Sequence, residues 1–248
     1  MAKKSLEELI KKFDAELAAE DEGYDVHVRL TFIADVLGTT SPDEDIYRSF
    51  IASKAPDATS IEEEVAALGA DDVFEKGTTI FPKDEDGKPF MWDYQVRGFF
   101  KAACSSLQRC GSAQMAKNTG KLKAFRKILD QCITVAPRKI KFNLSGEMGL
   151  CQRPLRAETA QGPRVAISSS ETVPAGSTVE FTVRLLNEDW VLALMEWLNY
   201  GQYNGMLQWR NSGAGAFVYE ILDDDGNVIG GNKANSSWAK MWSGQASA

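Results

Sequence analysis

The stretch that decides the fold of this chain is GQYNGMLQWRNSGAGAF, residues 201–217. It separates a segment with helical periodicity from a segment with strand alternation. Four of its residues are glycine, whose backbone can adopt positive φ angles and come close to a ligand. Trp209 adds a flat ring, and Arg210 adds a guanidinium. The pattern suits a loop that meets a phosphate backbone or another extended polymer, although a long turn between two elements would use glycine in the same way.

The segments on either side of this loop extend the pattern outward. Asn187 is a typical helix N-cap, and the acidic residues that follow it suit the positive end of a helix dipole. Apolar residues alternate over 179–185 and 216–222, which predicts one strand before the helix and one strand after the loop. The buried stripe expected for the helix consists of Trp190, Val191, Leu194, Trp197 and Leu198.

The N-terminal part of the chain predicts a helix, a strand and an insertion. A capping-box pattern opens a helix that we expect over residues 5–19. Residues 24–34 alternate between apolar and polar side chains, which predicts a half-buried strand with His27 on its polar face. Residues 37–80 form an insertion with two short helix candidates.

Strands and helices alternate between the insertion and the glycine-rich loop. A helix over residues 92–109 carries a broad apolar face, and Gly98 within it predicts close packing of the helix on a sheet. The other expected elements are a strand and turn over 78–89, a basic helix over 121–129, strands over 131–135, 139–144 and 164–168, and a turn over 171–178.

The larger elements follow the order strand, helix, strand, strand, helix, strand. This order predicts an α+β fold with a ferredoxin-like (RRM-like) βαββαβ core, elaborated by helical insertions and a C-terminal glycine-rich loop. Residues 1–23 are expected to form an N-terminal helix, and residues 24–229 the main domain with its insertion at 37–80. Residues 230–248 are rich in Gly, Asn, Ser and Ala, which predicts a flexible tail.

Charge is unevenly distributed along the chain. Between Lys117 and Arg164 there are eleven basic and three acidic residues, so this window carries +8. The whole chain carries −7, which leaves −15 for the remainder. A local positive field on an acidic body can attract a polyanion while limiting non-specific binding. Basic residues on the solvated face of one helix and one strand would give the same count.

The sequence offers no convincing metal, cofactor or membrane site. The four cysteines form no CxxC pair and the single histidine is distant, so we expect reduced, mostly buried thiols and no cofactor. The acidic cluster Asp43–Asp45 is explained by a helix start more simply than by a divalent metal. No apolar run reaches bilayer-spanning length and the first residues are charged, so we expect a cytoplasmic protein that does not bind membranes.

Three motifs coincide in order and spacing. Residues 86–101, DGKPFMWDYQVRGFFK, lead into the first long helix, and residues 171–181, ETVPAGSTVEF, precede the second. The third motif is the loop at 201–217, before the last strand. Together they resemble the RAMP superfamily, the RNA-binding subunits of CRISPR effector complexes, over residues 24–222.

The resemblance implies a non-catalytic protein that holds single-stranded RNA across the sheet and along a helix start. Backbone N–H groups of the glycine-rich loop would meet phosphates, and Trp209 or Tyr203 would stack on a base, unless Trp209 is a core or interface aromatic. The residues implied for RNA binding are Arg97, Lys101, Lys121, Lys123, Arg126, Lys127, Gly205, Trp209, Arg210, Gly213 and Gly215.

Assembly is also implied, because backbone subunits of this family stack head to tail. We therefore expect self-association or CRISPR-type partner subunits in antiviral defense. An acidic surface that mimics nucleic acid would instead fit a protein-interaction or inhibitor module, such as a phage-encoded mimic of a CRISPR subunit. An endoribonuclease is a third alternative, for which only His27, Asp35 and Asp43 are candidates. They have no evident partner set, so we assign no catalytic residue.

Overall fold

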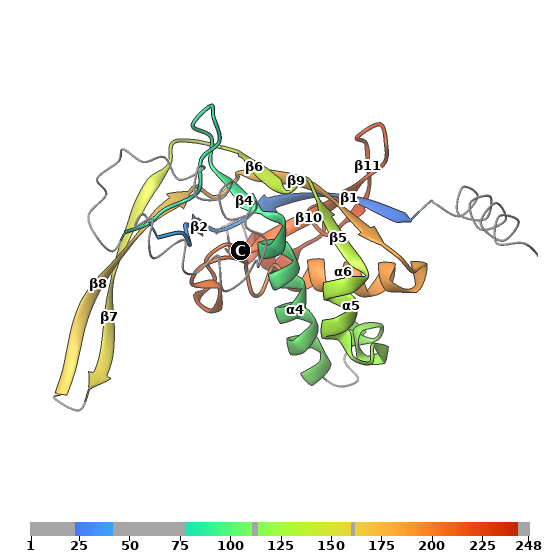
Figure 1. Cartoon of the computed structure of the whole chain (residues 1–248), viewed down its shortest axis with the longest axis horizontal. Coiled ribbons are helices and arrows are strands. Elements are labelled where there is room, and N and C mark those ends of the chain that lie inside the picture. The colour runs from blue at the N-terminus through green and yellow to red at the C-terminus, as the bar shows by residue number, and fades with distance from the viewer. Residues whose placement is uncertain (1–22, 42–77, 111–113, 160–161, 243–248) are drawn as a thin grey trace, which may run out of the picture.

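A computed structural model describes residues 23–41, 78–110, 114–159 and 162–242 of the chain. Its body is a mixed α+β arrangement in which three helices lie against one side of a large antiparallel sheet (Figure 1). The helix expected over 5–19, most of the insertion at 37–80 and the acidic cluster Asp43–Asp45 lie outside the described residues.

The main sheet has seven strands, and all of its pairings are antiparallel. Its order is β11 (Val228–Gly231), β10 (Phe217–Leu222), β1 (Tyr24–Phe32), β9 (Thr178–Leu185), β6 (Lys139–Asn143) and β4 (Phe90–Trp92). A further strand, β5 (Ile133–Ala136), pairs with the C-terminal half of β9, whereas β6 pairs with its N-terminal end. β5 and β6 thus both pair with β9, at different positions along it.

The alternation expected for β1 is confirmed. Val26, Val28, Leu30 and Phe32 are buried, whereas the residues between them are partly exposed. Because side chains of a strand point to alternate faces, the apolar set lies on the helix side of the sheet and the polar set on the open side. The same division continues onto β9, where Val179, Phe181 and Val183 are buried.

The helical layer consists of α4 (Asp93–Arg109), α5 (Phe125–Gln131) and α6 (Val191–Tyr200). The side chain of Gln95 accepts the Trp92 N–H at 2.9 Å and so caps the start of α4. Asn187 caps the short 3₁₀ turn η3 (Glu188–Trp190) before α6, as expected. Residues Leu194, Trp197 and Leu198 of the expected stripe are fully buried, and Trp190 and Val191 are partly buried.

The 3₁₀ turns η1 (Gln114–Ala116) and η2 (Thr119–Lys121) join α4 to α5. The Glu196 carboxylate on α6 accepts hydrogen bonds from the backbone N–H and side chain of both Asn118 and Thr119, at 2.7–2.9 Å. Trp197 Nε1 donates to Thr119 Oγ1 at 3.0 Å. These bonds fix η2 against α6. The start of the basic segment that follows η2 therefore has a defined position.

A second, smaller sheet carries a long hairpin. It contains β2 (Val36–Leu37), β8 (Gly162–Val173) and β3 (Thr78–Thr79), with β7 (Gly149–Thr159) paired along β8. The β7–β8 hairpin projects from the body at the left of Figure 1. The sequence predicts only a short strand at 164–168 and a turn from residue 171, and it misses β7. The strand instead continues to Val173, because the polar residues 168–172 pair with β7 and with β2 and β3.

Gly98 does not mark a close packing point, contrary to expectation. A Cβ built on it would meet no atom within 4 Å, so the apolar face of α4 contacts the sheet elsewhere. The cysteines also differ from expectation, because all four are free thiols but only Cys104 is fully buried.

Part of the expected tail has regular structure. β11 extends to Gly231, Asn232 Oδ1 accepts the Tyr219 N–H at 2.9 Å, and α7 (Ser237–Trp242) follows. Within the described residues, no helix is long and apolar enough to cross a membrane.

Candidate nucleic-acid interface

The glycine-rich loop folds back on itself through its glycines. A Cβ on Gly205 would lie 2.2 Å from the Gly215 carbonyl carbon, and a Cβ on Gly201 would lie 2.1 Å from the Phe217 ring. Gly215 donates its N–H to Asp35 O at 2.8 Å, and Gly213 donates to Arg210 O at 3.0 Å. The amide hydrogens of these two predicted phosphate contacts are therefore used within the fold, and all four glycines are buried.

The outer rim of the loop has a different character. Leu207 and Trp209 adopt positive φ angles of 65° and 60°, which bulky side chains rarely do. Such backbone costs about 1–3 kcal/mol, persists only where the surroundings impose it and is frequent at ligand sites. Trp209 is 44% exposed, so it is not a core aromatic. Arg210 is partly exposed and opens the 3₁₀ turn η4 (Arg210–Ser212).

Trp209 is stacked on an arginine that the sequence does not single out. The Arg153 guanidinium on β7 lies 3.9 Å from the centre of the Trp209 ring. This is the geometry of a cation–π contact. The contact joins the tip of the glycine-rich loop to the base of the projecting hairpin.

A polar cluster beside this pair attaches the loop to two strands of the small sheet, β3 and β8. Gln208 Oε1 accepts hydrogen bonds from Ser170 Oγ on β8 at 2.8 Å and from Thr79 Oγ1 on β3 at 3.1 Å. Thr79 Oγ1 also lies 2.8 Å from Ser170 Oγ. The residue before Trp209 is thus held by two other elements, which restrains the position of the indole.

The predicted cations on α4 are engaged in ion pairs. Arg97 contacts Asp93 at 2.8 Å, and Lys101 pairs with Asp130. Both cations are partly exposed, but a phosphate would have to compete with the carboxylates they already meet.

The predicted cations near α5 are more accessible. Lys121, Lys123, Arg126 and Lys127 are all exposed, and we call them the α5 basic cluster. In Figure 1, α5 lies to the right of α4, whereas the glycine-rich loop lies to its left, towards β7 and β8. The structure therefore brings Trp209 together with Arg153 and places the α5 basic cluster on the other side of α4.

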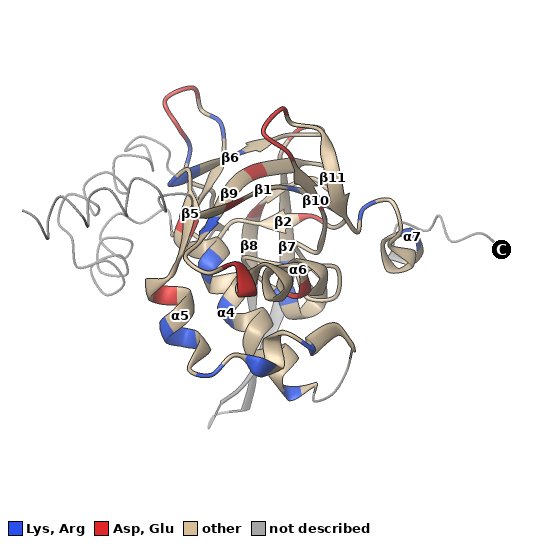
Figure 2. Cartoon of the chain, turned by 90° about the vertical axis from the view of Figure 1, so that its right-hand side faces the viewer, with Lys and Arg blue, Asp and Glu red and all other residues tan. Residues whose placement is uncertain are grey.

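Charge is segregated between the helical side and the sheet side. Figure 2 shows Lys and Arg over α4, α5 and the turns between them, with Asp or Glu also on α5 and beside α6, and Asp and Glu concentrated at the tips of two turns beyond the sheet. These turns are residues 84–87, before β4, and residues 223–226, between β10 and β11. The Lys141 ammonium beside Asp84 holds the pKa of that carboxyl below its usual value, and hydrogen bonds from Asn227 do the same for Asp223.

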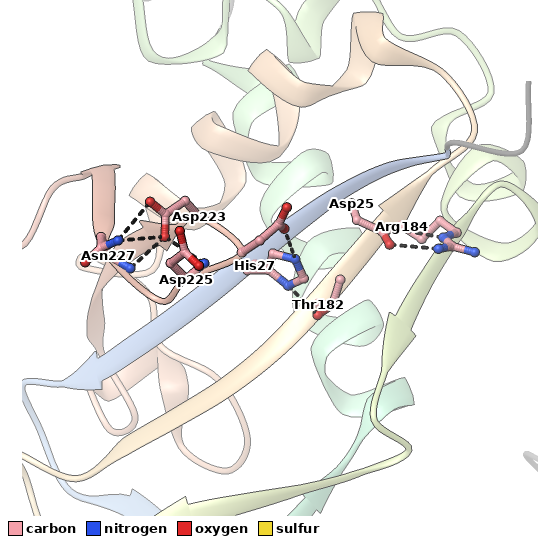
Figure 3. A network of polar contacts seen from close by, with 8 residues as sticks. Asp25, His27, Thr182, Arg184, Asp223, Asp225 and Asn227 are labelled. Carbon is pink, nitrogen blue, oxygen red and sulfur yellow. Dashed lines mark hydrogen bonds and ion pairs between the residues drawn. The ribbon is translucent and has the colours of Figure 1, made fainter.

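His27 lies on the open face of the sheet, within a polar network (Figure 3). Its Nδ1 is 2.8 Å from Thr182 Oγ1, and its Nε2 is 3.3 Å from Asp224. Neighbouring charges on this face are paired, with Arg29 on Glu180 and Arg184 on Asp25. A shallow hollow of about 280 Å³ adjoins the ring.

Asp35, another candidate of the nuclease alternative, accepts the Ala175 N–H, at 2.9 Å. Asp43 lies outside the described residues. Among the described residues, no group of three or more His, Cys, Asp or Glu side chains could hold a metal ion.

Comparison with known proteins finds a distant structural likeness. No protein-family model and no curated protein matches the chain. A chain in the cryo-EM structure of the Type III-B Cmr-beta bound to cognate target RNA aligns with it at 13% sequence identity and a TM-score of 0.45. The alignment covers 88% of this chain and 68% of that chain. A likeness of this extent carries no functional argument.

Proposed function

We propose that this chain is a non-catalytic RNA-binding protein of the RAMP type. The proposed core is ferredoxin-like: α4 lies between β1 and β5 in the chain, α6 lies between β9 and β10, and the strand order is β10, β1, β9, then β5 and β6. Antiparallel pairing throughout and helices on one face support this assignment. Single-stranded RNA is the proposed partner.

The observation that carries the proposal is the charge segregation. The α5 basic cluster is exposed, and two acidic residues on the same side are engaged, since Asp130 pairs with Lys101 and Glu196 accepts four hydrogen bonds from Asn118 and Thr119. Glu188 and Asp189 are exposed just before α6, so the positive potential is local to the α5 basic cluster, on a chain of net charge −7. Local positive potential attracts a polyanion in spite of the overall charge.

A salt series tests this function. Fluorescence anisotropy with a labelled, unstructured oligoribonucleotide should give an affinity that falls linearly with the logarithm of salt concentration. Replacing Lys121, Lys123, Arg126 and Lys127 by Ala should weaken binding and flatten the slope by about 3, at roughly 0.7 per lost phosphate contact. The matched control replaces Lys88, Arg184, Lys233 and Lys240, which are exposed and do not belong to the α5 basic cluster, and it should keep the slope although its net charge is identical.

Two results would overturn the proposal. The first is absence of RNA binding by the wild-type protein at low salt. The second is an equal loss of slope in the cluster variant and the control, which would mean that net charge alone governs the interaction.

The second candidate is a protein-interaction or inhibitor module. It is favoured by the acidic turns and by β11, an edge strand on which Val228 and Ile229 are 53% and 67% exposed. Both residues belong to the hairpin that carries the Asp223 turn, and a hollow of about 690 Å³ lies between Ile229, Val191 on α6 and the start of β1. Light scattering coupled to gel filtration tests the version with a second copy as partner, since Ile229→Lys should then convert an oligomer into a monomer.

The cellular setting is also proposed. We place the protein in the cytoplasm, in an oligomer or a CRISPR-type complex of antiviral defense, or on a phage as a mimic of such a subunit. The endoribonuclease alternative would be supported by RNA cleavage that disappears in His27→Ala. Both ring nitrogens of His27 already face Thr182 and Asp224, which favours a structural role.

A further inference from the structure

Arg153 is a buried cation that pairs with no carboxylate among the residues that the structure describes. Its side chain is only 8% exposed, and in the described part of the chain Nε and Nη1 have no hydrogen-bond partner. Burial of an unpaired charge is costly, and native proteins rarely leave such nitrogens unsatisfied. The face of the Trp209 ring compensates for only part of that cost.

The nearest acidic side chain along the hairpin is committed elsewhere. Arg153 pairs with Ser168 in the β7–β8 register, and Glu171 lies further along β8. The Glu171 carboxylate accepts the Phe81 N–H at 2.9 Å and contacts Lys83 Nζ at 3.1 Å. Glu171 is therefore not the missing counter-charge of Arg153, and an external anion can fill that place.

The position of Arg153 allows an anion to approach. Nε and Nη1 are buried and unpartnered whereas Nη2 is not one of these atoms, so the 8% of Arg153 that is exposed leaves Nη2 as the approach for a ligand. Because Nε and Nη1 are covered, the guanidinium offers an external phosphate a charge-assisted hydrogen bond through Nη2 rather than its full two-nitrogen fork.

Trp209 supplies the second half of the site. Arg153 covers one face of the indole, so the exposed area of the ring belongs to its other face and its edges. Gln208 is hydrogen bonded to Ser170 and Thr79, and this restrains the backbone that carries the ring. A ring fixed before binding loses little entropy when a flat ligand stacks on it.

We infer that Arg153 and Trp209 form a subsite for one nucleotide of a single-stranded RNA, an inference that rests on the RNA-binding function proposed above. The base stacks on the exposed face of Trp209, and its phosphate accepts a hydrogen bond from Arg153. A single strand is required because the faces of paired bases are covered by their neighbours in a duplex. The subsite is sequence-tolerant, since every base has a face that can stack.

The test compares two probes and two pairs of variants. The probes are a labelled oligouridylate of about 12 nucleotides and an abasic oligomer of the same length, which keeps the phosphates and lacks the bases. Trp209→Ala is compared with Tyr24→Ala, since both residues are 44% exposed. Arg153→Gln is compared with Arg184→Gln, which makes the same charge change on the open face of the sheet.

We expect Trp209→Ala to lower the affinity for oligouridylate about 5- to 150-fold, with an unchanged salt slope, because it removes a stacking contact and no phosphate contact. Arg153→Gln should lower the affinity and reduce the slope by about 0.7. The two control variants should bind as the wild type does. On the abasic probe, Trp209→Ala and the wild type should bind equally.

Three outcomes would overturn the subsite. If the wild type binds oligouridylate and the abasic oligomer equally well, no base is stacked; this comparison needs no substitution, so a misfolded variant cannot obscure it. If Trp209→Ala binds oligouridylate as tightly as the wild type, the ring is not used. In both cases RNA binding itself stands. If the wild type binds no RNA, the proposed function fails and the subsite fails with it.

Discussion

Two glycine-to-alanine substitutions should have opposite effects on stability. One is at Gly205 in the glycine-rich loop, and the other is at Gly98 in α4. In Gly205→Ala, the new Cβ would lie 2.2 Å from the Gly215 carbonyl carbon and 2.3 Å from Ala214 O, whereas ordinary contacts are 3.4–4 Å. Both neighbours are backbone, so the two arms of the loop have to separate by about 1 Å. Overpacking of this kind costs about 1–3 kcal/mol.

The same separation also removes a hydrogen bond. Met206 donates its N–H to Gly215 O at 3.1 Å, and the loss of such a bond costs about 1 kcal/mol. Gly205→Ala should therefore lower the free energy of unfolding by about 2–4 kcal/mol. For a chain of this size, that corresponds to a fall in melting temperature of roughly 5–15 °C.

Gly98→Ala is the control, because it makes the same chemical change inside α4 where nothing lies within 4 Å of the new Cβ. It should raise the free energy of unfolding by about 0.5–1 kcal/mol, since alanine restricts the unfolded chain and favours helix. Thermal unfolding followed by circular dichroism measures both variants. An unchanged melting temperature for Gly205→Ala, or an equal fall for both variants, would refute the reasoning.

Three further predictions concern thiols, pH and a helix cap. Burial raises the pKa of the Cys104 thiol to about 12, so iodoacetamide at pH 8 should label the exposed Cys110 first and reach Cys104 only on unfolding, as mass spectrometry of the peptides will show. The folded-state pKa of Asp84 is lowered, mainly by the hydrogen bond from Lys141, so its contribution is present above pH ~4 and is lost as pH falls through the folded value. Urea midpoints should therefore show Asp84→Asn to be less stable than the wild type at neutral pH, with a difference that shrinks in acid. Replacing the N-cap Asn187 by Ala should cost about 1 kcal/mol in the same assay, and a change below a few tenths would mean that the cap bond to the Asp189 N–H contributes nothing.

The elements that the sequence predicts correctly depend on local chemistry. The alternation of apolar and polar residues in β1 predicts which of its side chains are buried. The N-cap residue Asn187 predicts where the helical segment before the loop begins. Each signal lies within a few residues of the feature it predicts, so no knowledge of distant neighbours is needed. The α+β class and the position of the glycine-rich loop follow from such signals.

The β7–β8 hairpin was less predictable for a physical reason. Its base is polar on both faces, with three serines at 168–170, so it lacks the alternation that marks a half-buried strand. Gly98 led to the opposite kind of error, a predicted contact that does not exist. A glycine within a helix indicates close packing only where another element lies against it, and none does at Gly98. Arg153 also carries no local mark that separates it from the other arginines of the basic window.

The sequence by itself determined where β1, β9, β10, α4 and α6 lie, which of their residues face the core, and that a glycine-rich segment joins α6 to the last core strand. Only the tertiary structure decided that Gly205 packs on Gly215, that the α5 basic cluster is separated from the loop by α4, and that Trp209 lies on Arg153. The reason is that these contacts join residues from distant parts of the chain, and their energies depend on burial and geometry that no local pattern encodes.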